Sequence, residues 1–257
     1  MSPELETALA AAKLAAEISR SYYYGNFTVR TKADLTPVTQ ADVECEQAIK
    51  DTILQRFPEH GFFGEETGKT RSDADNLWLV DPIDGTKGFV RQYPFFSTQI
   101  ALMRGGRIQL GVSCGTMFDE LAWAERGLGA WLNDKPLAVS QLDDLKMAAI
   151  STGNLKSLAQ GDGWSKLGKW VSQAGRIRGY GDFYHYHLLA AGKIEAVIES
   201  DVNILDVAAL SVIVEEAGGM FTDMDGMPMG LESRSVLAAN PVLHGRLLDD
   251  FKGCLQP

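Results

Sequence analysis

The sequence lacks the features that mark disulfide-stabilised, zinc-binding or membrane-spanning proteins. Its 257 residues contain only three cysteines, which are widely spaced and form no Cys-x-x-Cys pair. An odd number of scattered cysteines argues against a disulfide framework or a zinc site. No apolar run approaches the ~20 residues that a membrane span needs. The N-terminus shows no basic leader or apolar core of a signal peptide, so we expect a cytoplasmic protein that does not enter membranes.

Blocks of basic residues are also missing. The chain carries 24 Lys and Arg against 34 Asp and Glu, a net charge of −10. Because nucleic acids require clustered Lys and Arg, we expect no nucleic-acid partner. We expect no Ser, Cys or Asp side chain to act as a covalent nucleophile.

What the chain does contain is the composition of a globular protein. Hydrophobic residues make up 45% and charged residues 23%, so disorder is not expected. The length suits one large or two modest domains. A polar stretch over residues 140–146 marks a boundary, which we place between an N-terminal domain, 1–142, and a C-terminal domain, 143–257.

Hydrophobic periodicity and cap residues predict a mixed α/β chain. Helices are predicted over residues 4–21, from an N-cap at Thr39 to about 57, and over 164–174, 182–191, 206–217 and from 241. Strands are predicted over residues 77–80, 97–103, 108–113, 121–125, 127–133, 148–151, 176–180, 194–199 and 235–239. The inward face of the second helix is predicted to include Val43, Ile49 and Ile53. Residues 32–37 are interpreted as a polar loop and residues 68–76 as a solvated flap.

The most informative stretch follows the strand over residues 77–80 and reads Asp-Pro-Ile-Asp-Gly-Thr-Lys-Gly, residues 81–88. Asp81 and Asp84 lie three residues apart around a proline that fixes its own φ. Gly85 permits a sharp turn and a close approach of backbone N–H groups to a ligand. Acids at a strand end followed by a Gly-Thr turn favour hard cations and a phosphate.

Three further motifs, in sequence order, accompany this stretch. They are Pro-Val-Thr-Gln-Ala-Asp42, Gly-Glu65-Glu66 and Asn-Ile-Leu-Asp206. Together the four motifs resemble the inositol monophosphatase superfamily of metal-dependent, lithium-sensitive phosphatases, over most of the chain. One departure is Leu205, which stands where that family usually has Trp.

The resemblance implies a layered αβαβα sandwich with the active site between its two halves. It also implies that Glu65, Asp81, Asp84 and Asp206, with the backbone carbonyl of Ile83, hold two or three Mg²⁺ ions. Oxygen ligands without His or Cys favour Mg²⁺ over zinc. Members of this superfamily are commonly dimers, so a homodimer is expected.

The mechanism implied by the resemblance uses a metal-activated water as nucleophile. Glu65 would take its proton, assisted by Thr86, and Asp42 would accept the Thr86 hydroxyl proton in a hydrogen bond. The N–H groups of Gly85 and Thr86 would hold phosphate oxygens. Lys87 adds a positive charge at this turn.

The neighbours of these motifs are more similar to the histidinol-phosphate phosphatase branch than to the inositol branch. L-Histidinol phosphate carries an ammonium and an imidazole, with which acids at the pocket rim would pair. Glu199 and Asp182 are the candidates, although a strand-end surface acid and a helix N-cap are equally open interpretations. Arg91 could reach the phosphate or be a solvated surface charge.

Alternatives within the superfamily stay open at this point. They are hydrolysis of inositol 1-phosphate or of a 3′-phosphoadenosine bisphosphate, because Asp-Gly-Thr-Lys also occurs in that last branch. A binding protein with a degraded site is a third interpretation, against which the retained acids argue. His185 and His187, two residues apart on a predicted helix, face different ways and are not expected to ligate one metal together.

Overall fold

The computed structural model describes residues 1–32 and 36–255, which form two sheets, a short hairpin and the helices that cover them. The first helix, α1 (Pro3–Tyr24), is rich in alanine, the best helix former, and begins with Ser2 as N-cap. The hairpin of β1 (Val29–Thr31) and β2 (Pro37–Thr39) leads into α2 (Gln40–Arg56).

An eight-stranded sheet follows from the motif-rich first half of the chain. In order across the sheet its strands are β10 (Lys135–Pro136), β9 (Ala130–Leu132), β8 (Glu120–Glu125), β7 (Arg107–Gly115), β6 (Ser97–Arg104), β5 (Asn76–Asp84), β3 (Gly61–Gly64) and β4 (Gly68–Thr70). All pairings are antiparallel except that of β3 with β5. The five-residue helix α3 (Thr86–Val90) and the 3₁₀ turn Thr116–Phe118 interrupt the sheet connections.

The second half builds a five-stranded sheet and five helices. Across the sheet the strands are β12 (Arg176–Arg178), β11 (Ala149–Thr152), β13 (Ala196–Ser200), β15 (Ser235–Ala239) and β14 (Met220–Thr222). The helices are α4 (Lys156–Ala159), α5 (Gly163–Gln173), α6 (Asp182–Ala190), α7 (Ile204–Glu216) and α8 (Pro241–Phe251).

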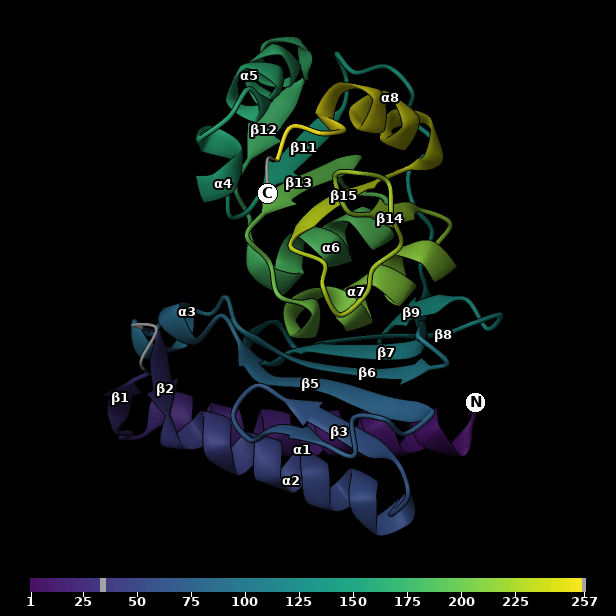
Figure 1. Cartoon of the computed structure of the whole chain (residues 1–257). Helices are drawn as coiled ribbons and strands as arrows, with labels where there is room; N and C mark the ends of the chain where they lie inside the picture. Colours follow the sequence, from purple (N-terminus) through teal and green to yellow (C-terminus); the bar gives the residue numbers. More distant parts are fainter. Residues whose placement is uncertain (33–35, 256–257) are drawn as a thin grey trace.

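These elements stack in five layers, as the resemblance implied (Figure 1). Helices α1 and α2 cover the outer face of the large sheet, α6 and α7 lie between the two sheets, and α5 and α8 cover the small sheet. The αβαβα sandwich is therefore confirmed. The largest apolar core lies in the middle layer, where residues of β5 such as Leu79 meet residues of α7 such as Leu210 and of β15 such as Val236. Both proposed domains contribute to this core; the boundary at residue 142 stays a prediction.

Several local predictions were wrong. Val43 is 51% exposed, whereas Ile49 and Ile53 are fully buried as predicted. The expected flap over residues 68–76 begins with an edge strand, β4, because Gly68–Thr70 pairs with β3. The hairpin of β1 and β2, the helices α3 and α4, and β14 were not foreseen, because each is too short to show a period. Residues 33–35, the centre of the predicted polar loop, lie outside the described residues. Among the described helices, none is long and apolar enough to cross a membrane.

The two halves approach each other closely at Gly111 on β7. A Cβ atom at this position would lie 2.4 Å from the carbonyl oxygen of Ala209 and 2.6 Å from its Cα, both backbone atoms of α7. We expect Gly111→Ala to lower the free energy of unfolding by about 1–3 kcal/mol, because the helix must move away from the sheet. Thermal or urea unfolding of the variant measures this change.

The matched control is Gly168→Ala in α5, where nothing lies within 4 Å of the position that the added methyl group would take. There alanine is the better helix former, so unfolding should be unchanged or shifted upward by roughly 0.5–1 kcal/mol. Equal stability of the two variants would contradict this account of how the halves pack.

Candidate active site

The site begins where β5 ends. The pairing of β5 with β6 shifts register between Asp81 and Asp84, which interrupts the alternation of side chains along the strand and lets both acids reach one point. The backbone N–H of Ile83 donates to Asp81 Oδ1 at 3.0 Å and fixes this turn. Gly85 then adopts φ +87°, and a Cβ there would lie 2.6 Å from the carbonyl oxygen of Phe95. Both conditions require glycine, and they allow α3 to start immediately beside the acids.

A third acid reaches the same point from the other half of the chain. Asp206 lies in the first turn of α7, where Oδ2 accepts the backbone N–H of Asn203 at 2.9 Å and completes a capping box. One carboxylate oxygen from each of Asp81, Asp84 and Asp206 lies within 4.8 Å of the other two. The middle layer therefore brings together acids that are 122 residues apart in sequence (206 − 84).

Ionisation of all three of these crowded carboxyl groups is unfavourable. Burial, followed by the charges of Glu65 and Asp84, raises the pKa of Asp81 well above its usual range. Burial also raises the pKa of Asp84 strongly and that of Asp206 to about 7, and neighbouring acids add to both shifts. Without a cation, some of these carboxyl groups must therefore hold protons at neutral pH.

These residues fit a hard divalent cation. The three donors are all carboxylates and include neither His nor Cys, which is the donor chemistry of Mg²⁺, Mn²⁺ or Ca²⁺ and not of structural zinc. The raised pKa values follow from the same crowding and agree with this fit, because a cation would replace the protons that the acids otherwise need.

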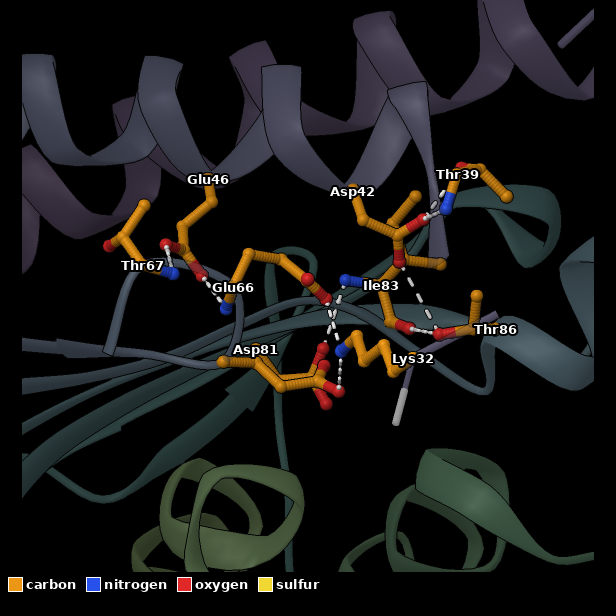
Figure 2. A network of polar contacts seen from close by, with 10 residues as sticks. Lys32, Thr39, Asp42, Glu46, Glu66, Thr67, Asp81, Ile83 and Thr86 are labelled. Atoms are coloured by element: carbon orange, nitrogen blue, oxygen red, sulfur yellow. Dashed lines mark hydrogen bonds and ion pairs between the residues drawn. The ribbon is translucent and has the colours of Figure 1, made fainter. Parts of the chain in front are cut away.

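A hydrogen-bonded group orders the predicted catalytic threonine (Figure 2). The Thr86 hydroxyl lies 3.0 Å from the Ile83 carbonyl oxygen and 3.3 Å from Asp42 Oδ1. The other oxygen of Asp42 accepts the backbone N–H of Thr39 at 2.8 Å and its hydroxyl at 2.6 Å. Asp42 is thus both the capping-box acid of α2 and a partner of Thr86, as predicted, and burial raises its pKa.

Glu65 faces the same cavity but has a partner that the sequence did not suggest. The Lys32 ammonium lies 2.9 Å from Glu65 Oε1 and 2.7 Å from Glu66 Oε1. These two bonds raise the pKa of Lys32, although burial opposes them. Burial raises the pKa of Glu66 to about 7. Lys32 follows an exposed strand and belongs to no motif, so no sequence signal identified it.

A buried acid of α2 holds the turn that carries Glu65. The carboxylate of Glu46, which is fully buried, accepts the backbone N–H groups of Glu66 at 2.7 Å and Thr67 at 2.8 Å (Figure 2). Gly64 leaves room for it, because a Cβ there would lie 2.4–2.5 Å from this carboxylate. Glu46 was also missed, although an acid on the predicted inner face of a helix was a usable signal.

The acids line a cavity of about 360 Å³ between the two halves of the chain. Its other lining residues include Gly85, Thr86, Lys87, Asn154 and Asp182. Of the predicted substrate residues, the structure thus brings Asp182 and Lys87 to the cavity.

Arg91 and Glu199 do not belong to the residues that line this cavity. Arg91 is exposed beyond the end of α3. Glu199 is buried, and its carboxylate accepts the Tyr186 hydroxyl at 2.8 Å and the Asn154 backbone N–H at 2.9 Å. Burial alone would raise the pKa of Glu199, but these bonds and the nearby His185 imidazole lower it. Asp182 opens α6 with φ +45° and is exposed to solvent, but partial desolvation by the surrounding groups and the charge of Glu199 raise its pKa to about 6.

The two histidines of α6 point to different partners, as predicted. His185 lies 3.2 Å from the Ser151 hydroxyl and 3.3 Å from Glu199 Oε2, whereas His187 lies 2.8 Å from Glu120 Oε2. Both are buried. Within the described part of the chain, neither belongs to a group of acids, His or Cys that could hold a metal.

Comparison with known proteins places this geometry in a family. The model of the inositol monophosphatase family matches residues 1–256. The histidinol-phosphatase of Mycobacterium tuberculosis is 37% identical over 95% of this chain and 96% of its own, and the inositol monophosphatase of Mesembryanthemum crystallinum is 32% identical over 98% and 97%. The crystal structure of the extragenic suppressor protein SuhB from Bartonella henselae superimposes with a TM-score of 0.90 at 31% identity, covering 98% of this chain and 99% of that one. This chain belongs to the inositol monophosphatase family.

Proposed function

We propose that this protein is a Mg²⁺-dependent phosphomonoesterase that hydrolyses L-histidinol phosphate to L-histidinol and phosphate, a step of histidine biosynthesis. The observation that carries the proposal is the meeting of Asp81, Asp84 and Asp206 within 4.8 Å at the cavity between the two halves. Three desolvated acids with raised pKa values are unfavourable unless a cation neutralises them, and a cation is also what an anionic substrate needs in an acidic protein.

The residues that would hold Mg²⁺ are Asp81, Asp84, Asp206 and Glu65, together with the carbonyl oxygen of Ile83. Two or three bound ions would supply positive charge that stabilises the phosphoryl group and makes water a better nucleophile.

The protein's own groups would move the proton and hold the ester. Glu65, which lines the cavity, would take the proton of the attacking water. Thr86 would assist, with its rotamer held by Asp42 and the Ile83 carbonyl. The N–H groups of Gly85 and Thr86, at the start of α3, would hold phosphate oxygens, and Lys87 would add positive charge at the cavity edge.

Asp182 supports the choice of a cationic alcohol as the leaving group. It lines the same cavity as the metal-site acids, and a carboxylate there would pair with an ammonium or an imidazolium. Inositol offers no cation, so this carboxylate would gain little from it. The identity to the histidinol-phosphatase of Mycobacterium tuberculosis, 37%, is slightly greater than the 34% to the inositol-1-monophosphatase of Mesorhizobium japonicum, which agrees with this preference. Inositol 1-phosphate and 3′-phosphoadenosine 5′-phosphate are the alternative substrates.

We further propose that the protein acts in the cytoplasm as a homodimer. Exposed aromatic residues such as Tyr24, which is 75% exposed, and the stacked pair Trp123 and Trp131 offer apolar surface for an interface.

The substrate proposal is tested by measuring phosphate release from L-histidinol phosphate, inositol 1-phosphate and 3′-phosphoadenosine 5′-phosphate with Mg²⁺. We expect kcat/KM for histidinol phosphate to exceed the other two by at least about tenfold, which corresponds to about 1.4 kcal/mol of transition-state discrimination. Glu65→Gln is the control and should lower turnover of every substrate by about 10²-fold or more. Preference for inositol 1-phosphate by a similar margin would overturn the substrate assignment.

Replacement of Asp182 by Asn tests how the leaving group is recognised. Asn has nearly the same shape but no charge, so KM for histidinol phosphate should rise by about tenfold, because the ion pair with the leaving group is lost. Hydrolysis of inositol 1-phosphate by the same variant should be unchanged. Equal effects on both substrates would show that Asp182 shapes the cavity instead of reading the cation.

The raised pKa of Asp206 predicts a pH-dependent stability of the metal-free protein. The group titrates at about 7 in the folded state and near 3.8 when unfolded, so the folded state binds more protons between these values and loses stability as pH rises toward 8. Asp206→Asn keeps an oxygen for the Asn203 cap but has no charge. In a chelating buffer it should therefore unfold at higher temperature than the unmodified protein at pH 8, by an amount worth about 1 kcal/mol or more, with little difference at pH 4.

Addition of Mg²⁺ at pH 8 should raise the melting temperature of the unmodified protein, because a ligand that binds only the folded state stabilises it. Asp206→Asn should respond much less. A variant that responds to Mg²⁺ as strongly as the unmodified protein would count against Asp206 as a ligand.

A further inference from the structure

A buried chain of hydrogen bonds leads away from Asp84 through the large sheet. It crosses β6 and β7, enters the middle layer and ends on β8, and its central member is the amide of Gln99. We call it the Gln99 relay. Its members, in order from the metal-site acid, are Asp84, Ser97, Gln99, Ser113, His187 and Glu120.

The end of the relay at the active site is tightly packed. The Ser97 hydroxyl donates to Asp84 Oδ2 at 3.2 Å, and the Gln99 amide nitrogen donates to Ser97 Oγ at 2.7 Å. Ser97 is 1% and Gln99 0% exposed. Water therefore does not compete for these bonds, and the hydroxyl of Ser97 has Asp84 Oδ2 as its acceptor.

The other end reaches the helix that carries both histidines. The second hydrogen of the Gln99 amide nitrogen is donated to Ser113 Oγ at 3.0 Å. Ser113 Oγ lies 2.8 Å from His187 Nε2, and His187 Nδ1 lies 2.8 Å from Glu120 Oε2. His187 is buried and its ring packs edge-on against Phe183. The ring is thus held on two sides by polar partners and on a third by an aromatic ring.

The direction of each hydrogen bond follows from counting hydrogens. An amide nitrogen has two hydrogens and donates both, so each serine accepts one and must give its own hydrogen elsewhere. Ser97 gives its hydrogen to Asp84, and Ser113 gives its hydrogen to His187 Nε2. The imidazole proton then lies on Nδ1 and is donated to Glu120, as is usual for a histidine beside a carboxylate. From Gln99 toward either end of the relay, each group therefore donates its hydrogen to the next group along the chain of hydrogen bonds.

One atom of the relay has no partner. Gln99 Oε1 is buried and accepts no hydrogen bond within the described residues. Turning the amide over would exchange an unpaired acceptor for an unpaired donor. It would also place an oxygen between the two serine hydroxyls, and both would then donate to Gln99. Asp84 would lose the Ser97 hydrogen. The amide orientation that makes Ser97 donate to Asp84 therefore leaves Gln99 Oε1 without a hydrogen-bond donor.

We propose that the Gln99 relay is a positioning device that fixes the orientation of Asp84 for cation binding. The inference rests on the proposed function, in which Asp84 is a metal ligand. Ser97 holds one carboxylate oxygen, Gln99 keeps Ser97 in the donating orientation, and Ser113 with His187 keeps Gln99 from turning over. Partners behind a metal ligand fix its geometry, and their removal commonly weakens metal binding or activity by 10- to 100-fold.

The test is calorimetric titration of the full-length, metal-free protein with Mn²⁺ alone. Ser97→Ala removes the donor to Asp84, and Gln99→Met keeps the size of the side chain but has no N–H group. We expect the dissociation constant for Mn²⁺ to rise by about tenfold in each. The double variant should bind no more weakly than Ser97→Ala, because both changes act through one hydroxyl. Ser113→Ala should have a smaller effect of the same sign.

Ser211→Ala is the matched control, since Ser211 is a buried serine whose hydroxyl bonds only locally, to the Ala208 carbonyl of α7 at 2.7 Å. It should bind Mn²⁺ like the unmodified protein, and melting curves of all metal-free variants should show one folded transition. Equal Mn²⁺ affinity of Ser97→Ala, Gln99→Met and the unmodified protein would overturn the inference, and so would fully additive losses in the double variant. Failure of the unmodified protein itself to bind Mn²⁺ would instead overturn the proposed metal site.

Discussion

Mutual repulsion among desolvated carboxylates is the constraint on which this structure depends. Asp81 and Asp84 end β5, and Asp206 begins α7, so packing of that helix on the sheet forces the acids together. Burial and like charge raise their pKa values, and the site becomes favourable only with protons or a cation in place. The packing that forms the largest apolar core therefore also crowds the carboxylates, and their charge must be neutralised by a cation or by protons.

Helix caps solve the problem of holding acids in such a site. Asp42 and Asp206 are both third residues of their helices and both accept the backbone N–H of the N-cap residue. Each helix start thus fixes one carboxylate oxygen and leaves the other free for Thr86 or for the cavity. Two buried side chains outside the cavity have a similar effect. Glu46 holds the turn that carries Glu65, and Ser97 holds Asp84. Orientation is set by backbone and buried polar groups before any ligand arrives.

The sequence predicted those parts of the site that depend on short local patterns. A Thr N-cap with an acid three residues later, a strand that ends in Asp-Pro, and a Gly-Thr turn each have a local physical meaning. The meeting of Asp206 with Asp84 was supplied by resemblance, since no local rule brings such distant residues together. Lys32 and Gln99 were missed because their roles depend on tertiary neighbours alone. Val43 was misassigned because the buried face of α2 runs through Asp42, Cys45 and Ile49 and leaves Val43 to one side of it.

The most direct measurement is a crystal structure of the protein with Mn²⁺, using anomalous scattering to locate the ion. This account predicts an anomalous peak among Asp81, Asp84 and Asp206, with carboxylate oxygens at roughly 2.0–2.6 Å, the range for hard divalent cations. A cavity in which these three carboxylates stay bonded to one another, with manganese bound elsewhere or not at all, would contradict it.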